Sequence, residues 1–226
     1  RRVARTAARP VASGAIPVSG AWAFVIAMSL VGLLVLLQLP RLAQLVALLS
    51  LALVAAYPFM KRITWWPQAW LGLTFNWGVW VGWACGADPA PLAAAALSYI
   101  GCVFWTLGYD CIYAVQDRED DALAGIRSAA RALGDRVRPA VAVFYTVAIL
   151  CFAAALLVAR PDPLILVGLA PAAAHLGWQV LRFRPEAPET VLAAFRSNAR
   201  AGLLLFLAFL LTIPLPMPLD LGRAGF

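Results

Sequence analysis

Long apolar runs alternate with short polar segments along nearly the whole chain. Seven such runs cover approximately 20–39, 41–60, 67–86, 91–110, 138–159, 163–181 and 201–218. Each is close to the roughly 20 residues that a helix needs to cross the hydrocarbon core of a bilayer. No succession of short strands with alternating polarity, which would indicate a barrel, interrupts them. The pattern predicts an all-α, multi-span transmembrane helical bundle.

Prolines and composition support this prediction. Proline marks several predicted ends, among them Pro40, Pro58 and Pro163, while Pro171 lies inside the sixth run, where we expect a kink. The chain is 63% hydrophobic and 13% charged, whereas soluble domains are about half apolar and about a quarter charged. Its four cysteines form no CxxC pair, which argues against a disulfide framework or a zinc site.

The basic residues fall almost entirely on one side of the predicted membrane. Of the 18 Lys and Arg residues, only Arg41, Arg160 and Arg223 lie in segments on the opposite side. An excess of Lys and Arg marks the cytoplasmic side of a membrane protein, so this scheme places the N-terminus inside. Topology therefore accounts for the net charge of +7. The sequence contains no stripe of aromatic and basic residues of the kind that would indicate a nucleic-acid partner.

Acidic residues also gather on the basic side, where topology does not explain them. If the fourth run continues as a helix at about 100° per residue, Asp117 and Asp121 lie within about 20° of Asp110 on one face. Stacked carboxylates repel one another unless cations compensate them. Oxygen ligands of this kind suit Mg²⁺, which also binds substrate phosphates. A solvated, acidic helix end is the alternative interpretation.

Three basic segments face the same surface. The second run ends in Tyr57-Pro58-Phe59-Met60-Lys61-Arg62, Arg127 follows the acidic stretch, and Arg5 and Arg9 lie near the start. Each is also explained as a topological anchor. Together with metal-binding acids, however, they suit a diphosphate that leaves an allylic carbon, since metal ions and bases stabilise the negative charge of the leaving group. The lipid tail would rest between apolar helices.

At these residues the sequence resembles the UbiA superfamily of intramembrane prenyltransferases, within which it is most similar to the bacterial 4-hydroxybenzoate polyprenyltransferases. Residues 109–128, YDCIYAVQDREDDALAGIRS, are similar to the second aspartate-rich motif of that family. Further similar segments are YPFMKRITWWPQ at 57–68, RTAARPVASG at 5–14, and Ser197-Asn198 before the last apolar run. The resemblance covers essentially the whole chain.

The resemblance implies a fold of nine transmembrane helices around a central cavity, of which seven lie in this sequence. Residues 1–226 would form a single membrane-embedded domain that lacks the two N-terminal helices and the first aspartate-rich motif. The implied roles are as follows: Asp117 and Asp121 hold magnesium; Asp110 acts on the acceptor phenol; Lys61 and Arg62 take part in catalysis at the diphosphate; Arg127, Tyr113, Tyr57 and Arg5 contact substrate.

These implications define the expected function. It is the Mg²⁺-dependent transfer of a polyprenyl group from its diphosphate to 4-hydroxybenzoate in ubiquinone biosynthesis, in the inner membrane of a bacterium with the site facing the cytoplasm. No obligatory protein partner is implied. A sister enzyme with another aromatic, chlorin or haem acceptor is the first alternative. An ion-coupled transporter is the second, although transporters place charges or broken helices at mid-membrane.

Other polar residues inside the runs have structural interpretations. His175 is expected to be packed and hydrogen-bonded, and Asn76 to line a cavity or bond to a neighbouring helix. Asp88 and Asp162 are expected to cap loops.

Overall fold

The computed structural model describes residues 8–87, 89–123, 125 and 127–211, and these contain helices and no strand. The longest helices are α3 (Val18–Leu36), α4 (Arg41–Ile63), α7 (Leu92–Ala114), α10 (Val137–Ala159) and α11 (Leu166–Arg182). The shorter ones are α2 (Pro10–Ser13), α5 (Pro67–Phe75), α6 (Gly78–Cys85), α8 (Arg118–Leu123), α9 (Ala129–Leu133), α12 (Pro188–Arg196) and α13 (Asn198–Leu210). Two 3-10 turns are η1 (Gly134–Arg136) and η2 (Pro163–Ile165). The all-α prediction is confirmed.

Six helical segments of the described chain are long and apolar enough to cross a membrane. The expected run 67–86 is not among them, because it is divided into α5 and α6 at Asn76 and Trp77. At the break, Asn76 Nδ2 donates to the Gly72 carbonyl (2.8 Å), the Cys102 carbonyl (3.2 Å) and Thr106 Oγ1 (2.8 Å). The amide thus supplies the polar contacts that an interrupted helix needs in a membrane, and its predicted bond to a neighbouring helix is confirmed.

Several predicted ends move. Helix α4 continues through Pro58 to Ile63, so this proline does not end the helix. Pro171 lies inside α11, as predicted, and the kink expected there stays a prediction. The last span begins at Pro188, earlier than predicted, because α12 precedes α13 with only Ser197 between them. Its predicted part 212–218 lies outside the described residues.

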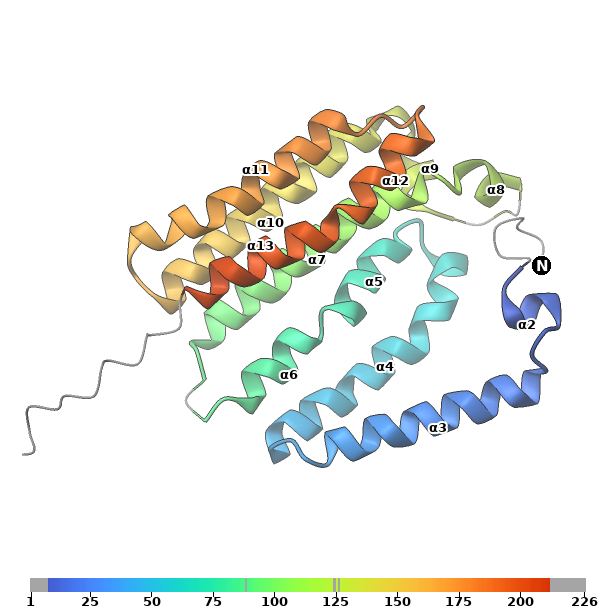
Figure 1. The fold of residues 1–226 in the computed structure, drawn as a ribbon, viewed down its shortest axis with the longest axis horizontal. Helices are drawn as coiled ribbons and strands as arrows, with labels where there is room; N and C mark the ends of the chain where they lie inside the picture. The colour runs from blue at the N-terminus through green and yellow to red at the C-terminus, as the bar shows by residue number, and fades with distance from the viewer. Residues whose placement is uncertain (1–7, 88, 124, 126, 212–226) are drawn as a thin grey trace, which may run out of the picture.

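The helices alternate in direction, as the distribution of charge predicts. In Figure 1, α2, α8, α9, α12 and the end of α4 lie at one end of the bundle, and the α3–α4 and α6–α7 connections lie at the other. The first of these ends, called the basic end below, carries Arg62, Arg118, Arg127, Arg131, Arg136, Arg138, Arg182 and Arg184.

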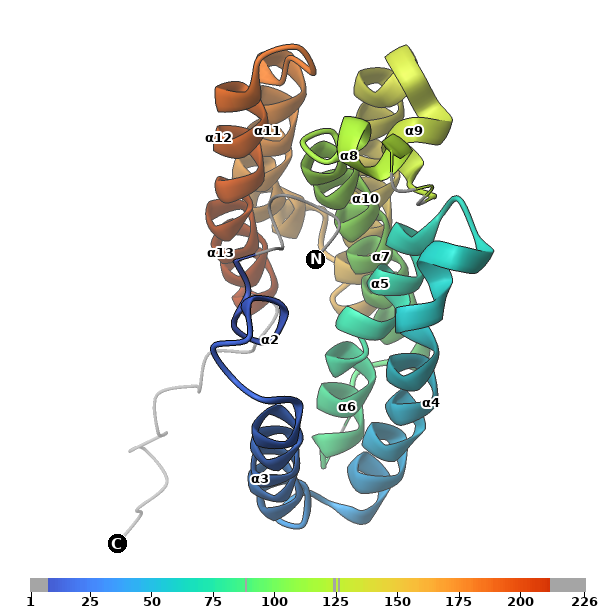
Figure 2. The same ribbon diagram turned by 90° about the vertical axis from the view of Figure 1, so that its right-hand side faces the viewer.

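The core of the bundle is the pair α7 and α10, onto which α5, α11 and α12 pack. Two glycines on α7 allow the close approach: a Cβ at Gly101 would overlap the Phe152 ring, and one at Gly108 would overlap the Tyr145 ring. Helix α3 lies furthest from this core (Figures 1 and 2) and has no buried residue. Its apolar side chains suit a hydrocarbon surrounding.

Candidate active site

The segment from Asp110 to Asp121, called the acidic motif below, lies at the basic end, where α7 ends and α8 begins. Four consecutive amides, from Val115 to Arg118, bond to the carbonyl three residues earlier at 3.1–3.3 Å. Such a 3-10 segment turns by about 120° per residue rather than 100°. The uninterrupted helix expected from Asp110 to Asp121 is therefore absent, and the three carboxylates do not form one straight stripe.

Asp117 and Asp121 nevertheless remain adjacent. They lie one helical turn apart, since the Asp121 amide donates to the Asp117 carbonyl at 2.7 Å. Asp117 and Asp121 are buried, with 8% and 5% of their surface exposed. Asp110, inside α7, is half-buried. Within the described residues, no three His, Cys, Asp or Glu side chains come close enough together to hold a metal ion.

Helix α4 brings Tyr57 to the same region. Tyr57 is half-buried and lies near enough to Asp110 for the two to interact electrostatically. Arg62 is exposed near the end of α4. The Lys61 side chain and all of Arg5 lie outside the described residues. The roles predicted for these residues stay predictions.

Arg127 is fixed against the end of α4. Its Nη1 donates to the Ile63 carbonyl at 2.8 Å, and its guanidinium lies 5.8 Å from the centre of the Trp65 ring. Arg131 approaches the same ring at 5.3 Å and also donates to the Asp121 carbonyl at 3.4 Å. Cation–π contacts of this kind are attractive. They hold two arginines of the α8–α9 segment beside the acidic motif.

A depression of about 1120 Å³ opens beside the motif at the basic end. Its charged lining residues are Asp117, Arg118, Glu119, Arg131, Asp135 and Glu186. The last two come from the α9–α10 and α11–α12 connections. The depression therefore joins Asp117 to acids and bases from three separate segments.

A row of aromatic rings extends from the acidic motif into the bundle. On α7, the Trp105 and Tyr109 rings lie 5.7 Å apart, and Phe195 of α12 contacts both Tyr109 (6.2 Å) and Tyr113 (4.6 Å). Tyr113 thus lies in the row next to the acids, as a site residue would, and its assignment to the substrate stays a prediction.

Behind this row lies a buried polar network at the α12–α13 junction. Asn198 Oδ1 accepts from Trp105 Nε1 at 2.9 Å, and Gln179 Nε2 donates to Ser197 Oγ at 2.9 Å. Gln179 Oε1 accepts from the Tyr145 hydroxyl at 2.7 Å. The network connects α7, α10, α11 and the last span, and so fixes the wall that carries the aromatic row.

Two of the predictions for other polar residues are confirmed. His175 Nε2 lies 3.1 Å from the Ser197 carbonyl and stacks on Trp178, so it is a packed, hydrogen-bonded residue. Asp162 Oδ1 accepts from the Leu164 amide at 3.0 Å and caps η2. Asp88 lies outside the described residues.

Sequence reasoning missed Gln179, Tyr145 and Gln68. Gln68 is buried at the start of α5, and its Oε1 accepts from the Ala129 amide at 3.3 Å, which joins α5 to the segment after the acidic motif. The available signal was the presence of polar side chains, two amides and a phenol, inside or at the end of apolar runs, where such groups seek partners on other helices.

The comparison with protein families agrees with this architecture. The model of the UbiA prenyltransferase family matches residues 1–210. The chain belongs to this family. Curated relatives of this UbiA chain include the mitochondrial 4-hydroxybenzoate polyprenyltransferases of Aedes aegypti, 39% identical over 210 residues, and Arabidopsis thaliana, 39% identical over 206 residues. They cover 93% and 91% of this chain, which in turn covers 48% and 50% of their length.

Two further comparisons are with a fungal relative and with a solved structure. The UbiA prenyltransferase claS of Ampulloclitocybe clavipes is 35% identical over 201 residues, which are 88% of this chain and 64% of that protein. The solved structure of a UbiA homologue from Aeropyrum pernix K1 has a TM-score of 0.77 at 24% identity and covers 92% of this chain and 78% of its own. The UbiA fold is therefore shown, and the chain spans about half to two thirds of the length of these curated relatives.

The relatives correct the expected localisation. Similar enzymes from insects, mammals and a plant are mitochondrial, so the prediction of a bacterial inner membrane is wrong. The bacterial membrane was implied by the resemblance, whereas the excess of Lys and Arg on one side sets only the orientation of a protein and does not distinguish one membrane from another. The membrane-spanning helices themselves are present.

Proposed function

We propose that the protein to which this UbiA chain belongs transfers a polyprenyl group from a polyprenyl diphosphate to 4-hydroxybenzoate in ubiquinone biosynthesis. The observation that carries the proposal is the similarity, at 35–39% identity over about nine tenths of the chain, to curated enzymes named for this reaction. The anchored arginines at the basic end support it, because a diphosphate needs positive charge around it. The buried acids beside them support it because carboxylates can hold a metal cation that adds to this charge.

Magnesium fits the acids that this chain supplies. Asp117 and Asp121 offer two carboxylates one helical turn apart, and Mg²⁺ is usually bound by one or two carboxylates together with water and substrate phosphate. When bound, it would supply positive charge that stabilises the leaving diphosphate. Lys61, Arg62, Arg127 and Arg5 would contact the diphosphate directly.

The remaining residues would act on the acceptor. Asp110 lies one turn before the C-terminal end of α7 and directly follows Tyr109 of the aromatic row in the sequence. We assign it to orienting the phenol of the acceptor and accepting a proton from it. Tyr113 and Tyr57 would form the walls around the reacting carbon, where the surrounding rings exclude water that would otherwise capture an allylic cation.

The test measures prenylated product from the full-length protein in membranes supplied with polyprenyl diphosphate, labelled 4-hydroxybenzoate and Mg²⁺. Asp117→Asn and Asp121→Asn should each lower kcat/KM at least about a hundredfold, as loss of an electrostatic contact to the leaving group does. Glu189→Gln changes an exposed acid in the first turn of α12, at the same end of the bundle but outside the lining of the depression, and is the control. Undiminished activity in both aspartate variants, or full activity in excess EDTA, would contradict the magnesium role.

A second candidate is prenyl transfer to another aromatic acceptor. The similarity to claS favours it, since the name of that relative specifies prenyl transfer without 4-hydroxybenzoate. Supplying 4-hydroxybenzoate in competition with other phenols distinguishes the two. Preference for a different phenol would replace the acceptor and leave the assignment of the diphosphate site intact.

A further inference from the structure

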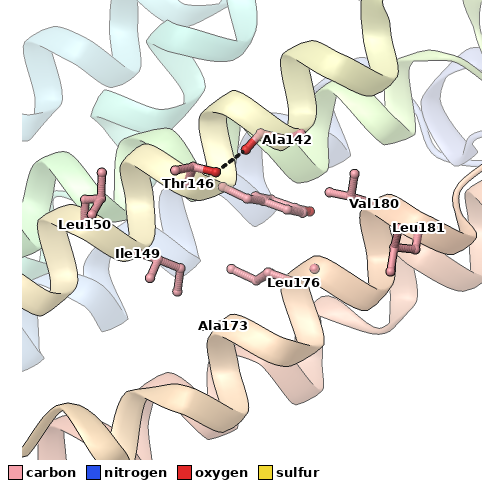
Figure 3. A pocket seen from close by; sticks show the side chains of 10 residues that line it. Ala142, Thr146, Ile149, Leu150, Ala173, Leu176, Val180 and Leu181 are labelled. Carbon is pink, nitrogen blue, oxygen red and sulfur yellow. Dashed lines mark hydrogen bonds between the residues drawn. The ribbon is translucent and has the colours of Figure 1, made fainter.

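A second hollow lies away from the acidic motif, on the outward side of α10 and α11. It has a volume of about 460 Å³, within the range of small-molecule sites. In Figure 3, Ile149 of α10 and Leu176 of α11 point into the space between the two helices. From Ala142 to Leu150 the groove is about 12 Å long at 1.5 Å per residue. Leu150 and Leu181 at its rim are 63% and 72% exposed, so it faces the membrane.

The walls of this groove accept only an apolar occupant. Two hydroxyls reach it, and both already have partners: Tyr145 donates to Gln179 Oε1 at 2.7 Å, and Thr146 donates to the Ala142 carbonyl at 2.8 Å (Figure 3). Gly177 deepens the groove, since a Cβ there would meet no atom within 4 Å. A hydrocarbon chain satisfies such a surface, while a polar aromatic acid would find no free donor.

Cations stand at the end of the groove nearest the basic end of the bundle. Arg138 Nε donates to the Val180 carbonyl at 2.9 Å and Nη2 to the Leu181 carbonyl at 3.1 Å, and both of these residues line the groove. Since a guanidinium has five N–H groups, others remain to bind an anion. Arg182, in the last turn of α11, is exposed. Neither arginine forms an ion pair within 4.0 Å among the described residues.

We propose that this groove binds one anionic phospholipid, with an acyl chain between α10 and α11 and the phosphate at Arg138 and Arg182. The apolar groove alone would suit any lipid, and the arginines at its mouth select one with negative charge. The bonds of Arg138 to the end of α11 hold its guanidinium in place before the lipid arrives. The site is separate from the acidic motif, so the proposal stands independently of the reaction.

The test uses the full-length protein in phosphatidylcholine vesicles that contain phosphatidylglycerol with a photoreactive group on its acyl chain. Crosslinked peptides are identified by mass spectrometry. Labelling should concentrate on α10 near Ile149 and on α11 near Leu176. It should exceed labelling by phosphatidylcholine with the same chain by roughly 25-fold, because each of the two arginines near an anionic lipid contributes a factor of about 5.

Two pairs of variants separate the chain from the phosphate. Arg138→Gln with Arg182→Gln should reduce phosphatidylglycerol labelling to the phosphatidylcholine level, while Arg41→Gln, an exposed arginine at the opposite end, should not. Gly177→Leu fills the groove and should remove labelling by both lipids. Gly32→Leu, another glycine with open space around it, is its control. The arginine pair tests the site even if Gly177→Leu does not fold.

Four results would overturn the proposal. One is equal labelling of the groove by the two lipids. Another is labelling of the exposed helix α3 that is as strong as labelling of the groove. The third is selective labelling by a photoreactive isoprenoid diphosphate, which would make the groove a donor site. The fourth is crosslinking of groove residues to a second copy of the chain.

Discussion

Replacing Gln179 by leucine tests whether the buried network holds the last span against the core. Gln179 is fully buried and bonds to three side chains: it accepts from Tyr145 (2.7 Å) and Asn198 (3.4 Å) and donates to Ser197 (2.9 Å). Leucine fills a similar volume, so the change removes polar contacts more than packing. It leaves the Tyr145 hydroxyl, whose residue is 3% exposed, without its acceptor.

Two magnitudes bound the effect on the free energy of unfolding. A buried donor left without a partner costs about 1–3 kcal/mol. Hydrogen bonds between membrane helices contribute about 0.6 kcal/mol on average and up to about 1.7 kcal/mol. Because Gln179 makes three such bonds, we expect Gln179→Leu to lower the free energy of unfolding by about 1–2 kcal/mol. Tyr145→Phe removes one bond and should cost about 0.6–1.7 kcal/mol.

The assay is a double-mutant cycle on the reversible unfolding of the full-length protein in detergent, followed by circular dichroism. The double variant should be more stable than the sum of the two single changes predicts, by about 0.5 kcal/mol or more, since phenylalanine leaves no stranded hydroxyl. Thr146→Val is the control, because that hydroxyl is exposed and bonds within its own helix. Additivity within about 0.3 kcal/mol, or an equal loss in the control, would refute the coupling.

Two further substitutions test how α7 meets its neighbours. Gly108→Ala places a methyl group against the Tyr145 ring and should lower the free energy of unfolding by about 1–3 kcal/mol, measured in the same detergent assay, whereas no change would mean that the ring moves freely. Asn76→Ala removes three hydrogen bonds at the α5–α6 break and should increase amide hydrogen exchange there; unchanged exchange would show that the backbone alone maintains the break.

Most spans were predictable because hydrocarbon imposes one requirement on every crossing segment: an apolar surface about 20 residues long. The break in 67–86 was not, since the side chains of this run are almost wholly apolar and only its partners on α7 show why the helix stops. Asn76 reaches the Cys102 carbonyl and the Thr106 hydroxyl only after α5 and α7 have packed. A single sequence contains no record of that contact.

The acidic motif shows a different limit. Its residues and its place at the basic end followed from composition and topology, and Asp117 and Asp121 do lie adjacent. The relation of Asp110 to them did not, because it depends on four local hydrogen bonds that tighten the chain between α7 and α8. A change of about 20° per residue over such a segment is invisible in side-chain periodicity, yet it decides which carboxylates can share a cation.

The arginines of the basic end fall into two physical classes that a count of charges treats as one. Arg62 is exposed near the end of α4, so binding a phosphate would require ordering a long side chain, which costs up to about 2 kcal/mol. Arg127 and Arg138 already bond to the terminal carbonyls of α4 and α11, where the helix dipole favours a cation. Their ordering is completed on folding. An anchored arginine therefore loses less side-chain entropy when its remaining N–H groups bind an anion, and its net free energy of binding is more favourable. Both anion sites proposed for this chain include an anchored arginine.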